Sequence, residues 1–254
     1  MRVQPIKTHP ITGQDDALLA ILDRYLTTFQ DGTILAITSK IVSICQGRTI
    51  PVAEADKQDL IEQEADYWLP PEANRYGVSL TIVDHVLIPM AGVDESNAAG
   101  HYILWPRDPQ HVANQVRGYL GARFALNHVG VIITDSKTTP LRWGVTGVAI
   151  AHSGFLAVND LIGHPDLFGR PLHMTKVDVA DALAAAAVLV MGEADEGTPL
   201  ALIEDLPFVT FQARDPTPEE VEARWIDMEA DLYAPLLQAA GWRRGERGTG
   251  PAEG

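Results

Sequence analysis

The sequence has few of the residues on which several classes of protein depend. It contains one cysteine, Cys45, in 254 residues, which excludes an internal disulfide and a cysteine-rich zinc site. Lys and Arg number 19 against 34 Asp and Glu, so the net charge at pH 7 is -15. Basic residues are needed to neutralise phosphates, so this deficit argues against nucleic-acid partners and anionic membrane surfaces. A small anionic ligand remains compatible, because a few cations or a bound metal can create a local positive site.

Long hydrophobic runs are also missing. No apolar stretch approaches the ~18 residues that cross a bilayer. The polar N-terminus contains Pro5 and Pro10, which is not typical of a signal peptide. We therefore expect a soluble, cytoplasmic protein, and 46% hydrophobic residues are enough to fill its core.

Several standard motifs are absent from the chain. It has no G-x-x-x-x-G-K-[ST] phosphate loop, no H-E-x-x-H, no C-x-x-C and no G-x-S-x-G. The eight histidines do not cluster at the spacing of metal ligands. His85, His128 and His152 lie in apolar surroundings, and we predict that each is a hydrogen-bonded structural residue.

The apolar pattern predicts helices and strands in mixed order. Helical spacing covers residues 17–28, 60–69, 109–124 and 179–192, and a T-P-E-E capping box at Thr217 predicts a last helix through about Ala240. Strands are expected within residues 32–44, 78–88, 100–106, 131–135, 147–155 and 200–206, the first of them entering a turn or short helix. Because βαβ alternation is not strict, we predict an α+β or mixed α/β fold. Residues 241–254 are low in complexity and are expected to form a mobile tail.

Three carboxylate-bearing turns could carry chemistry. They contain Asp94, Glu95 and Asn97; Asp135 and Ser136; and Glu193, Asp195 and Glu196. Mg²⁺ and Mn²⁺ prefer oxygen ligands, typically a few carboxylates together with substrate phosphates. Taken alone, each turn is more often a plain turn, because Asp, Asn and Gly favour turns for local hydrogen-bonding reasons. The spacing along the sequence does not show whether the three turns lie close together in the folded protein.

A fourth segment, T-S-K-I-V-S-I-C-Q-G-R at residues 38–48, carries hydroxyls and Lys40 directly after a strand. These groups could contact a phosphate. The alternative is a polar strand end with a solvated lysine, and the spacing alone favours that alternative.

Five segments in this order resemble one known family. They are D-G-T-I-L-A-I-T-S-K-I-V-S-I-C-Q-G-R, A-G-V-D-E-S-N, G-V-I-I-T-D-S followed by R-W-G-V-T-G-V-A-I, D-L-F-G-R-P-L, and V-A-D-A-L-A-A-A-A-V-L-V-M-G-E-A-D-E-G-T-P. Together they are similar to the coenzyme F420-0:γ-glutamyl ligases. The similarity covers residues 3 to 207, and residues 1–215 are therefore expected to form the ligase domain, followed by the helix at 216–240.

The resemblance implies a GTP-dependent amide-bond ligase of unusual mixed fold, forming an intertwined homodimer. Such enzymes add L-glutamate to the carboxylate of the phospholactate tail of a deazaflavin, and a second glutamate through a γ-linkage. The carboxylate is activated as an acyl phosphate. The resemblance also implies Mg²⁺ or Mn²⁺ at two sites, with K⁺ assisting.

The same resemblance assigns roles to individual residues. It implies metal ligands at Asp94, Asp135, Ser136 and Glu193, and catalytic roles for Asp135 and Arg142. It implies nucleotide contacts at Ser39, Lys40, Asn97, Met191, Gly192, Ala194, Asp195 and Gly197.

The segment after Asp135 departs from the family pattern D-T-x-G-R-x-x-R-x-G. Arg142 and Gly144 are retained, but Thr138 and Thr139 replace a glycine and an arginine that would suit an acceptor phosphodiester. Lys137 could compensate as a point charge. Two alternatives therefore stay open: a diverged γ-glutamyl ligase acting on another carboxylate, such as a folate-like one, and a non-catalytic nucleotide- or deazaflavin-binding protein.

Overall fold

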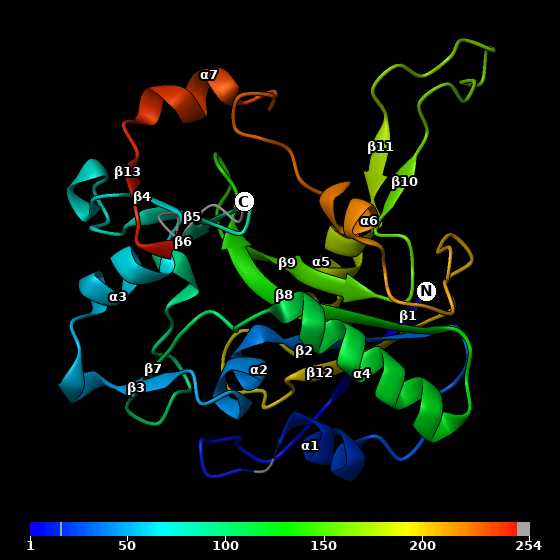
Figure 1. Cartoon of the computed structure of the whole chain (residues 1–254), viewed down its shortest axis with the longest axis horizontal. Coiled ribbons are helices and arrows are strands. Elements are labelled where there is room, and N and C mark those ends of the chain that lie inside the picture. The colour runs from blue at the N-terminus through cyan, green and yellow to red at the C-terminus, as the bar shows by residue number, and fades with distance from the viewer. Residues whose placement is uncertain (16, 248–254) are drawn as a thin grey trace.

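A five-stranded sheet forms the centre of the molecule, in the order β1–β12–β2–β8–β9 (Figure 1). The computed structural model describes residues 1–15 and 17–247. The strands of this sheet are β1 (Arg2–Ile6), β2 (Thr33–Thr38), β8 (Val129–Thr138), β9 (Val145–Ser153) and β12 (Leu200–Glu204). β2 and β8 are parallel, and the other neighbours are antiparallel. The predicted mixed α/β class is confirmed.

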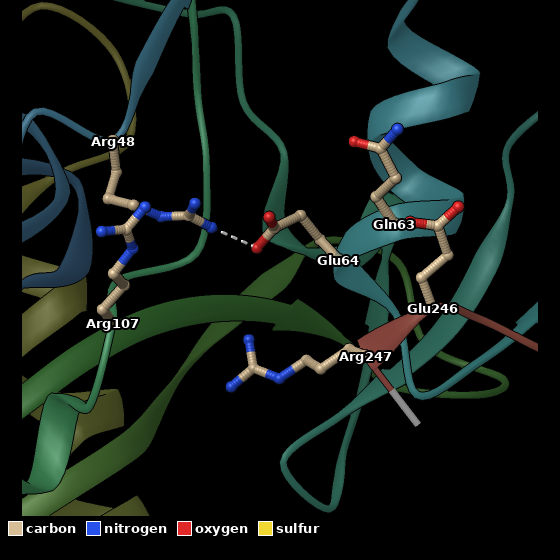
Figure 2. A pocket seen from close by; sticks show the side chains of 6 residues that line it. All are labelled: Arg48, Gln63, Glu64, Arg107, Glu246 and Arg247. Atoms are coloured by element: carbon tan, nitrogen blue, oxygen red, sulfur yellow. Dashed lines mark hydrogen bonds and ion pairs between the residues drawn. The ribbon is translucent and has the colours of Figure 1, made fainter. Parts of the chain in front are cut away.

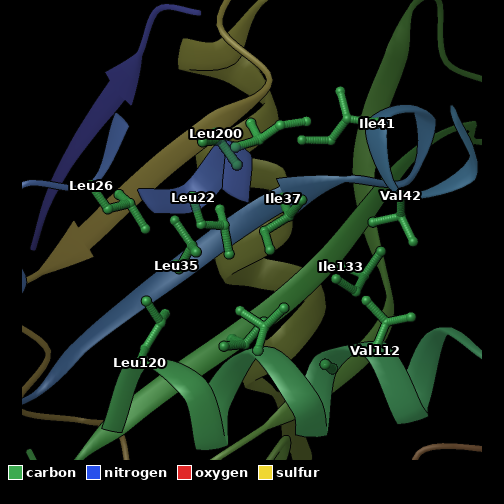
Figure 3. Close-up of a cluster of buried hydrophobic side chains, with 14 of the residues drawn as sticks. Leu22, Leu26, Leu35, Ile37, Ile41, Val42, Val112, Leu120, Ile133 and Leu200 are labelled. Atoms are coloured by element: carbon green, nitrogen blue, oxygen red, sulfur yellow. The ribbon is translucent and has the colours of Figure 1, made fainter. Parts of the chain in front are cut away.

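Helices cover both faces of this sheet because its inner strands are apolar on both sides. One face packs against α1 (Leu18–Tyr25), α2 (Ser39–Cys45) and α4 (Pro109–Phe124), with Leu35, Ile37 and Ile133 buried beneath them (Figure 3). The other face packs against α5 (Val179–Met191), through alternate residues such as Ile34 and Ile132. None of the described helices is long and apolar enough to cross a membrane.

A second, smaller layer lies beside the main sheet (Figure 1). Its four-stranded sheet has the order β13–β4–β5–β6, and β3 pairs with β7 in a separate ladder. The bounds are β3 (Thr49–Pro51), α3 (Lys57–Glu64), β4 (Tyr67–Leu69), β5 (Leu80–Val83), β6 (Val86–Pro89), β7 (His101–Ile103) and β13 (Arg243–Arg244). An arm, β10 (Val158–Asp160) and β11 (Lys176–Asp178), extends away from the body. The 3₁₀ turns are Val52–Glu54, Pro71–Ala73, Met90–Gly92 and Gln238–Ala240.

Local capping explains why the helix starts could be predicted. α4 begins at Pro109, as the pattern predicted, and Asp108 accepts a hydrogen bond from the amide of His111 at 3.0 Å. α5 begins after Asp178, whose side chain accepts from the amide of Asp181 at 2.8 Å. Both caps satisfy amides that the first helical turn leaves without partners.

Two of the predicted helices are wrong in extent. The helix predicted over residues 60–69 ends at Glu64, because Tyr67–Leu69 pairs with β5 and buries Trp68. The single helix predicted over 216–240 is two short helices, α6 (Pro218–Glu222) and α7 (Ala234–Leu237). The capping box at its start is confirmed, but Pro235 lacks the amide proton that a continuous helix requires.

The C-terminal segment is more ordered than its composition predicted. Arg243–Arg244 forms β13 on β4, and the guanidinium of Arg243 lies 4.8 Å from the ring centroid of Trp68. Gly245 lies so close to the backbone of Ala65 that an added Cβ would be 2.1 Å from the carbonyl oxygen. The prediction of a mobile tail is therefore wrong for residues 241–247, and residues 248–254 lie outside the described part of the chain.

The predicted hydrogen-bonding role is wrong for His152. Its side chain is fully buried on β9, and neither ring nitrogen has a hydrogen-bond partner among the described residues. Burial, reinforced by repulsion from Arg224, lowers the pKa of His152 to about 3. The ring is therefore neutral in the folded protein at pH 7.

We expect His152 to make the protein acid-sensitive. Because its folded-state pKa is below the usual value, the unfolded state binds more protons between about pH 3 and pH 6.5. Above pH 6.5 the ring is neutral in both states, and His152 does not lower the free energy of unfolding. As pH falls below that value, the free energy of unfolding decreases by up to about 1.4 kcal/mol per pH unit. Urea unfolding at several pH values gives the slope of the free energy of unfolding against pH. This slope should be shallower for His152→Leu than for wild type. His111→Asn, an exposed control, should keep the wild-type slope; equal slopes in all three would contradict the assignment.

Candidate active site

The parallel pairing of β2 and β8 sets the geometry of the site. Thr38, the last residue of β2, lies opposite Thr134 in the middle of β8. The next residues, Ser39 and Asp135, are therefore neighbours, although 96 positions separate them in the sequence. The Ser39 hydroxyl donates a hydrogen bond of 2.7 Å to Oδ2 of Asp135, and the amide of Ser136 donates one of 2.6 Å to Oδ1.

Asp135 has an unusual protonation equilibrium. Burial raises the pKa of this carboxyl to about 6, and the negative charge of Asp94 adds to the rise. The hydrogen bond from Ser39 and the charge of Lys40 oppose the rise without cancelling it. A metal ion beside Asp135 would stabilise the ionised carboxylate and offset the cost of its burial.

The Asp94 turn approaches from the other layer. Asp94 forms an isolated antiparallel bridge with Ile103, the last residue of β7, which also pairs with Thr49 of β3. Its Oδ2 lies 2.6 Å from Nζ of Lys40, which also donates to the carbonyl and hydroxyl of Ser96. Burial alone would raise the pKa of Asp94, but the hydrogen bond and charge of Lys40 hold it below the usual value. Asp94 is therefore ionised at neutral pH, with Lys40 as its counter-ion.

The turn after α5 completes the group. Oγ of Ser136 donates a hydrogen bond of 2.6 Å to Oε1 of Glu193, and Nδ2 of Asn97 donates one of 2.7 Å to the carbonyl of Ala194. Gly192 has φ +80°, and the carboxylate of Glu196 folds over it to accept from the amide of Ala194 at 2.9 Å. The Asp94 turn, the turn after α5 and the Asp135–Ser136 segment, separate in sequence, therefore approach one another. The prediction that Asp135 and Ser136 form a turn is wrong, because β8 continues through both residues to Thr138 and pairs them with β9.

The donor set fits a hard cation. The side chains of Asp94, Asp135, Ser136 and Glu193 offer only oxygen ligands. Among the described residues, the hydrogen-bond donors to the Asp135 carboxylate are the Ser39 hydroxyl and the Ser136 amide, neither of which is cationic. Within residues 1–15 and 17–247, however, no three His, Cys, Asp or Glu side chains are close enough together to hold one ion. An ion here would therefore complete its coordination with water or phosphate oxygens, as Mg²⁺ commonly does.

Among the residues that the structure describes, some of the predicted site residues make no hydrogen bond or ion pair with the side chains of Asp94, Asp135 or Glu193. Arg142 is exposed in the β8–β9 loop, where its guanidinium donates to the carbonyl of Leu141. Lys137 lies 3.7 Å from Asp181 at the start of α5. Asp195 is exposed on the turn after α5. Met191 and Gly197 support that turn through their carbonyls, which accept from Thr198 and from the amide of Thr8.

Two contributors to the site were not singled out from the sequence. Ser96 accepts from Lys40 through two oxygens and also donates to Asp94 at 3.0 Å. Thr8, from the segment after β1, anchors the glycine turn at Gly197. The local D-E-S-N pattern could have indicated Ser96 as a turn hydroxyl, whereas no sequence signal connects Thr8 with Gly197.

Comparison with known proteins gives this group of residues a context. A family model described as F420-0:Gamma-glutamyl ligase matches residues 5–205. The chain belongs to this family. The matched region includes Ser39, Asp94, Asp135 and Glu193, and it ends before α6 and α7.

Three relatives of this ligase family carry the name coenzyme F420:L-glutamate ligase. The Methanopyrus kandleri protein is 35% identical over 222 residues, covering 81% of this chain and 87% of its own length. The Methanococcus maripaludis strain C7 protein is 34% identical over 223 residues, covering 82% and 89%. The Archaeoglobus fulgidus protein is 32% identical over 224 residues, covering 81% and 89%.

Proposed function

We propose that this chain is a GTP-dependent ligase that joins L-glutamate to the carboxylate of coenzyme F420-0. The observation that carries the proposal is the approach of three carboxylate-bearing segments beside the end of β2, through the Ser39–Asp135, Lys40–Asp94 and Ser136–Glu193 contacts. A protein that only bound a nucleotide would not need all three carboxylates. The family membership and the names of the relatives support the same reaction class.

The reaction would proceed in two steps. A carboxylate oxygen of the acceptor attacks the γ-phosphorus of GTP, GDP leaves, and an acyl phosphate forms. The amine of glutamate then attacks the acyl carbon, phosphate leaves, and the nitrogen releases a proton. A second round on the new side-chain carboxylate would create the γ-linkage.

Metal ions fit this chemistry because both steps move charged phosphates. Mg²⁺ or Mn²⁺, held by Asp94, Asp135, Ser136 and Glu193 with K⁺ assisting, would supply charge neutralisation and in-line alignment. Ser39 orients the Asp135 carboxylate through its hydrogen bond. Lys40 lies at the same centre and is suited to bind a phosphate as a compact charge.

The remaining residues suit binding roles. Asn97 holds the 191–198 turn, whose backbone would support the nucleotide. Arg142 is exposed after β8, where its guanidinium would bind an anionic group of the acceptor. A cytoplasmic location would suit these substrates.

We also propose that the protein acts as an intertwined homodimer. The β10–β11 arm extends away from the main body (Figure 1), and the loop between its strands carries exposed apolar side chains. Leu167, Phe168 and Met174, in the loop between β10 and β11, are 99%, 91% and 81% exposed. A patch of this kind on an extended arm suits burial against a second copy of the chain.

A ligation assay tests the proposed function. Purified protein with GTP, Mn²⁺, K⁺, glutamate and the deazaflavin precursor should give a product heavier by one or two glutamyl units, with GDP released. Mass spectrometry reports both. GDP release only with a different carboxylate would favour a diverged γ-glutamyl ligase. Nucleotide binding without turnover on any carboxylate would contradict the ligase proposal.

A further inference from the structure

A hollow lined by arginines lies apart from the carboxylate centre. Its volume is about 340 Å³, and its lining residues are Arg48, Gln63, Glu64, Arg107, Glu246 and Arg247 (Figure 2). None of these residues belongs to the candidate active site. Three cations around one small hollow are notable in a chain with net charge -15.

Two of the three arginines are held in place by carboxylates. Arg48 donates from Nε to the carbonyl of Trp105 at 3.1 Å, and from Nη2 to Glu64 at 2.5 Å. Nη2 of Arg247 lies 2.6 Å from Oδ2 of Asp84. Each guanidinium has five N–H groups, so both retain donors beyond these contacts.

Hydrogen bonds hold the backbone of Arg107 in place, but its side chain is not held in this way. The side chain of Gln46 accepts from the Arg107 amide and donates to its carbonyl, both at 2.8 Å. Its guanidinium makes no hydrogen bond or ion pair with any residue in the described part of the chain. Arg48 lies close by, because its Nε reaches the carbonyl of Trp105, two residues before Arg107. Of these two neighbouring cations, only Arg48 pairs with a carboxylate of the hollow, Glu64, so the positive charge of Arg107 is left uncompensated there.

From this arrangement we infer that the hollow is a binding site for a phosphoryl group, either free phosphate or the phosphate of a small ester. Figure 2 shows Arg48, Arg107 and Arg247 approaching the same space from different directions. A tetrahedral phosphoryl group can accept from three such directions, whereas a planar carboxylate matches one or two guanidinium forks.

The acidic lining residues do not oppose this occupant. Glu64 is neutralised by its pair with Arg48. The side chains of Glu246 and Gln63 lie together at the other end of the hollow, away from the guanidinium groups of Arg48 and Arg107 (Figure 2). The anion would therefore lie at the arginine end.

Calorimetric titration of the full chain with sodium phosphate in 150 mM NaCl, without nucleotide or divalent metal, tests the site. We expect one equivalent to bind saturably, and Arg107→Ala to weaken binding about tenfold to a hundredfold, the loss typical of charge-assisted hydrogen bonds. Arg24→Ala is a matched control, because Arg24 is also exposed and lies on α1, outside the hollow and the proposed dimer surface. It should bind as wild type does. Glycerol 3-phosphate in place of phosphate distinguishes the two sources, and the tighter ligand identifies the occupant.

A further variant separates this site from the proposed ligase. Asp135→Asn should keep phosphate binding even though it should lose ligation, so the two proposals can fail independently. Loss of phosphate binding in Asp135→Asn would place the anion at the carboxylate centre and overturn the inference. It would also be overturned by an unchanged Arg107→Ala, by the absence of saturable binding, or by citrate binding more tightly than either phosphate compound.

Discussion

Asp135→Asn should lower kcat/KM for ligation by about a thousandfold or more. The side chains are nearly identical in shape, but the amide loses the negative charge that would hold a metal ion against the nucleotide phosphates. Metal-dependent charge stabilisation supplies several kcal/mol in such reactions, which corresponds to about this factor in rate. Steady-state GDP release and product mass measure the loss.

The fold should survive this substitution. The pKa of Asp135 is raised to about 6 by burial, so its charge is costly to the folded state, and asparagine can still accept from Ser39. Urea unfolding at pH 7 should give stability equal to wild type or slightly higher. Asp59→Asn, the same chemical change on the exposed surface of α3, should alter neither property. Retention of more than a tenth of wild-type activity by Asp135→Asn would refute the metal assignment.

Gly154→Ala should be among the most destabilising single substitutions. Gly154 follows β9 with φ +82°, and an added Cβ would lie 1.9 Å from the carbonyl oxygen of Val129. The clash is with backbone on the neighbouring strand, so no rotamer change relieves it. Backbone strain and overpacking each cost about 1–3 kcal/mol, and together we expect a loss of at least about 3 kcal/mol in the free energy of unfolding.

Gly32→Ala separates the cost of the positive φ from the cost of the steric clash. Gly32 has a similar φ, +76°, but nothing lies within 4 Å of an added Cβ. It should therefore lose only about 1–2 kcal/mol, the cost of the left-handed conformation for alanine. Denaturant unfolding followed by tryptophan fluorescence measures both variants. Equal losses would show that the close approach to Val129 contributes nothing.

Local sequence was enough to predict the helices whose apolar spacing and capping residues lie within one short segment. α4 and α5 were predicted almost to the residue, because apolar spacing and a side-chain cap lie within each segment. β1 was not predicted, because its polar sequence with Pro5 gains strand structure only by pairing with β12 at the sheet edge. Trp68 was assigned to a helix because the pairing that makes it part of a strand comes from β5.

The same division applies to the candidate site. The sequence by itself indicated the oxygen-bearing side chains Asp94, Asp135 and Glu193, although Asp135 lies within β8 rather than after it. Only the tertiary structure decided that they meet, because the parallel pairing of β2 with β8 brings Ser39 to Asp135 across 96 positions. The arginine hollow was invisible in the sequence for the same reason. Arg48, Arg107 and Arg247 share no local pattern, and only chain folding brings their charges around one space.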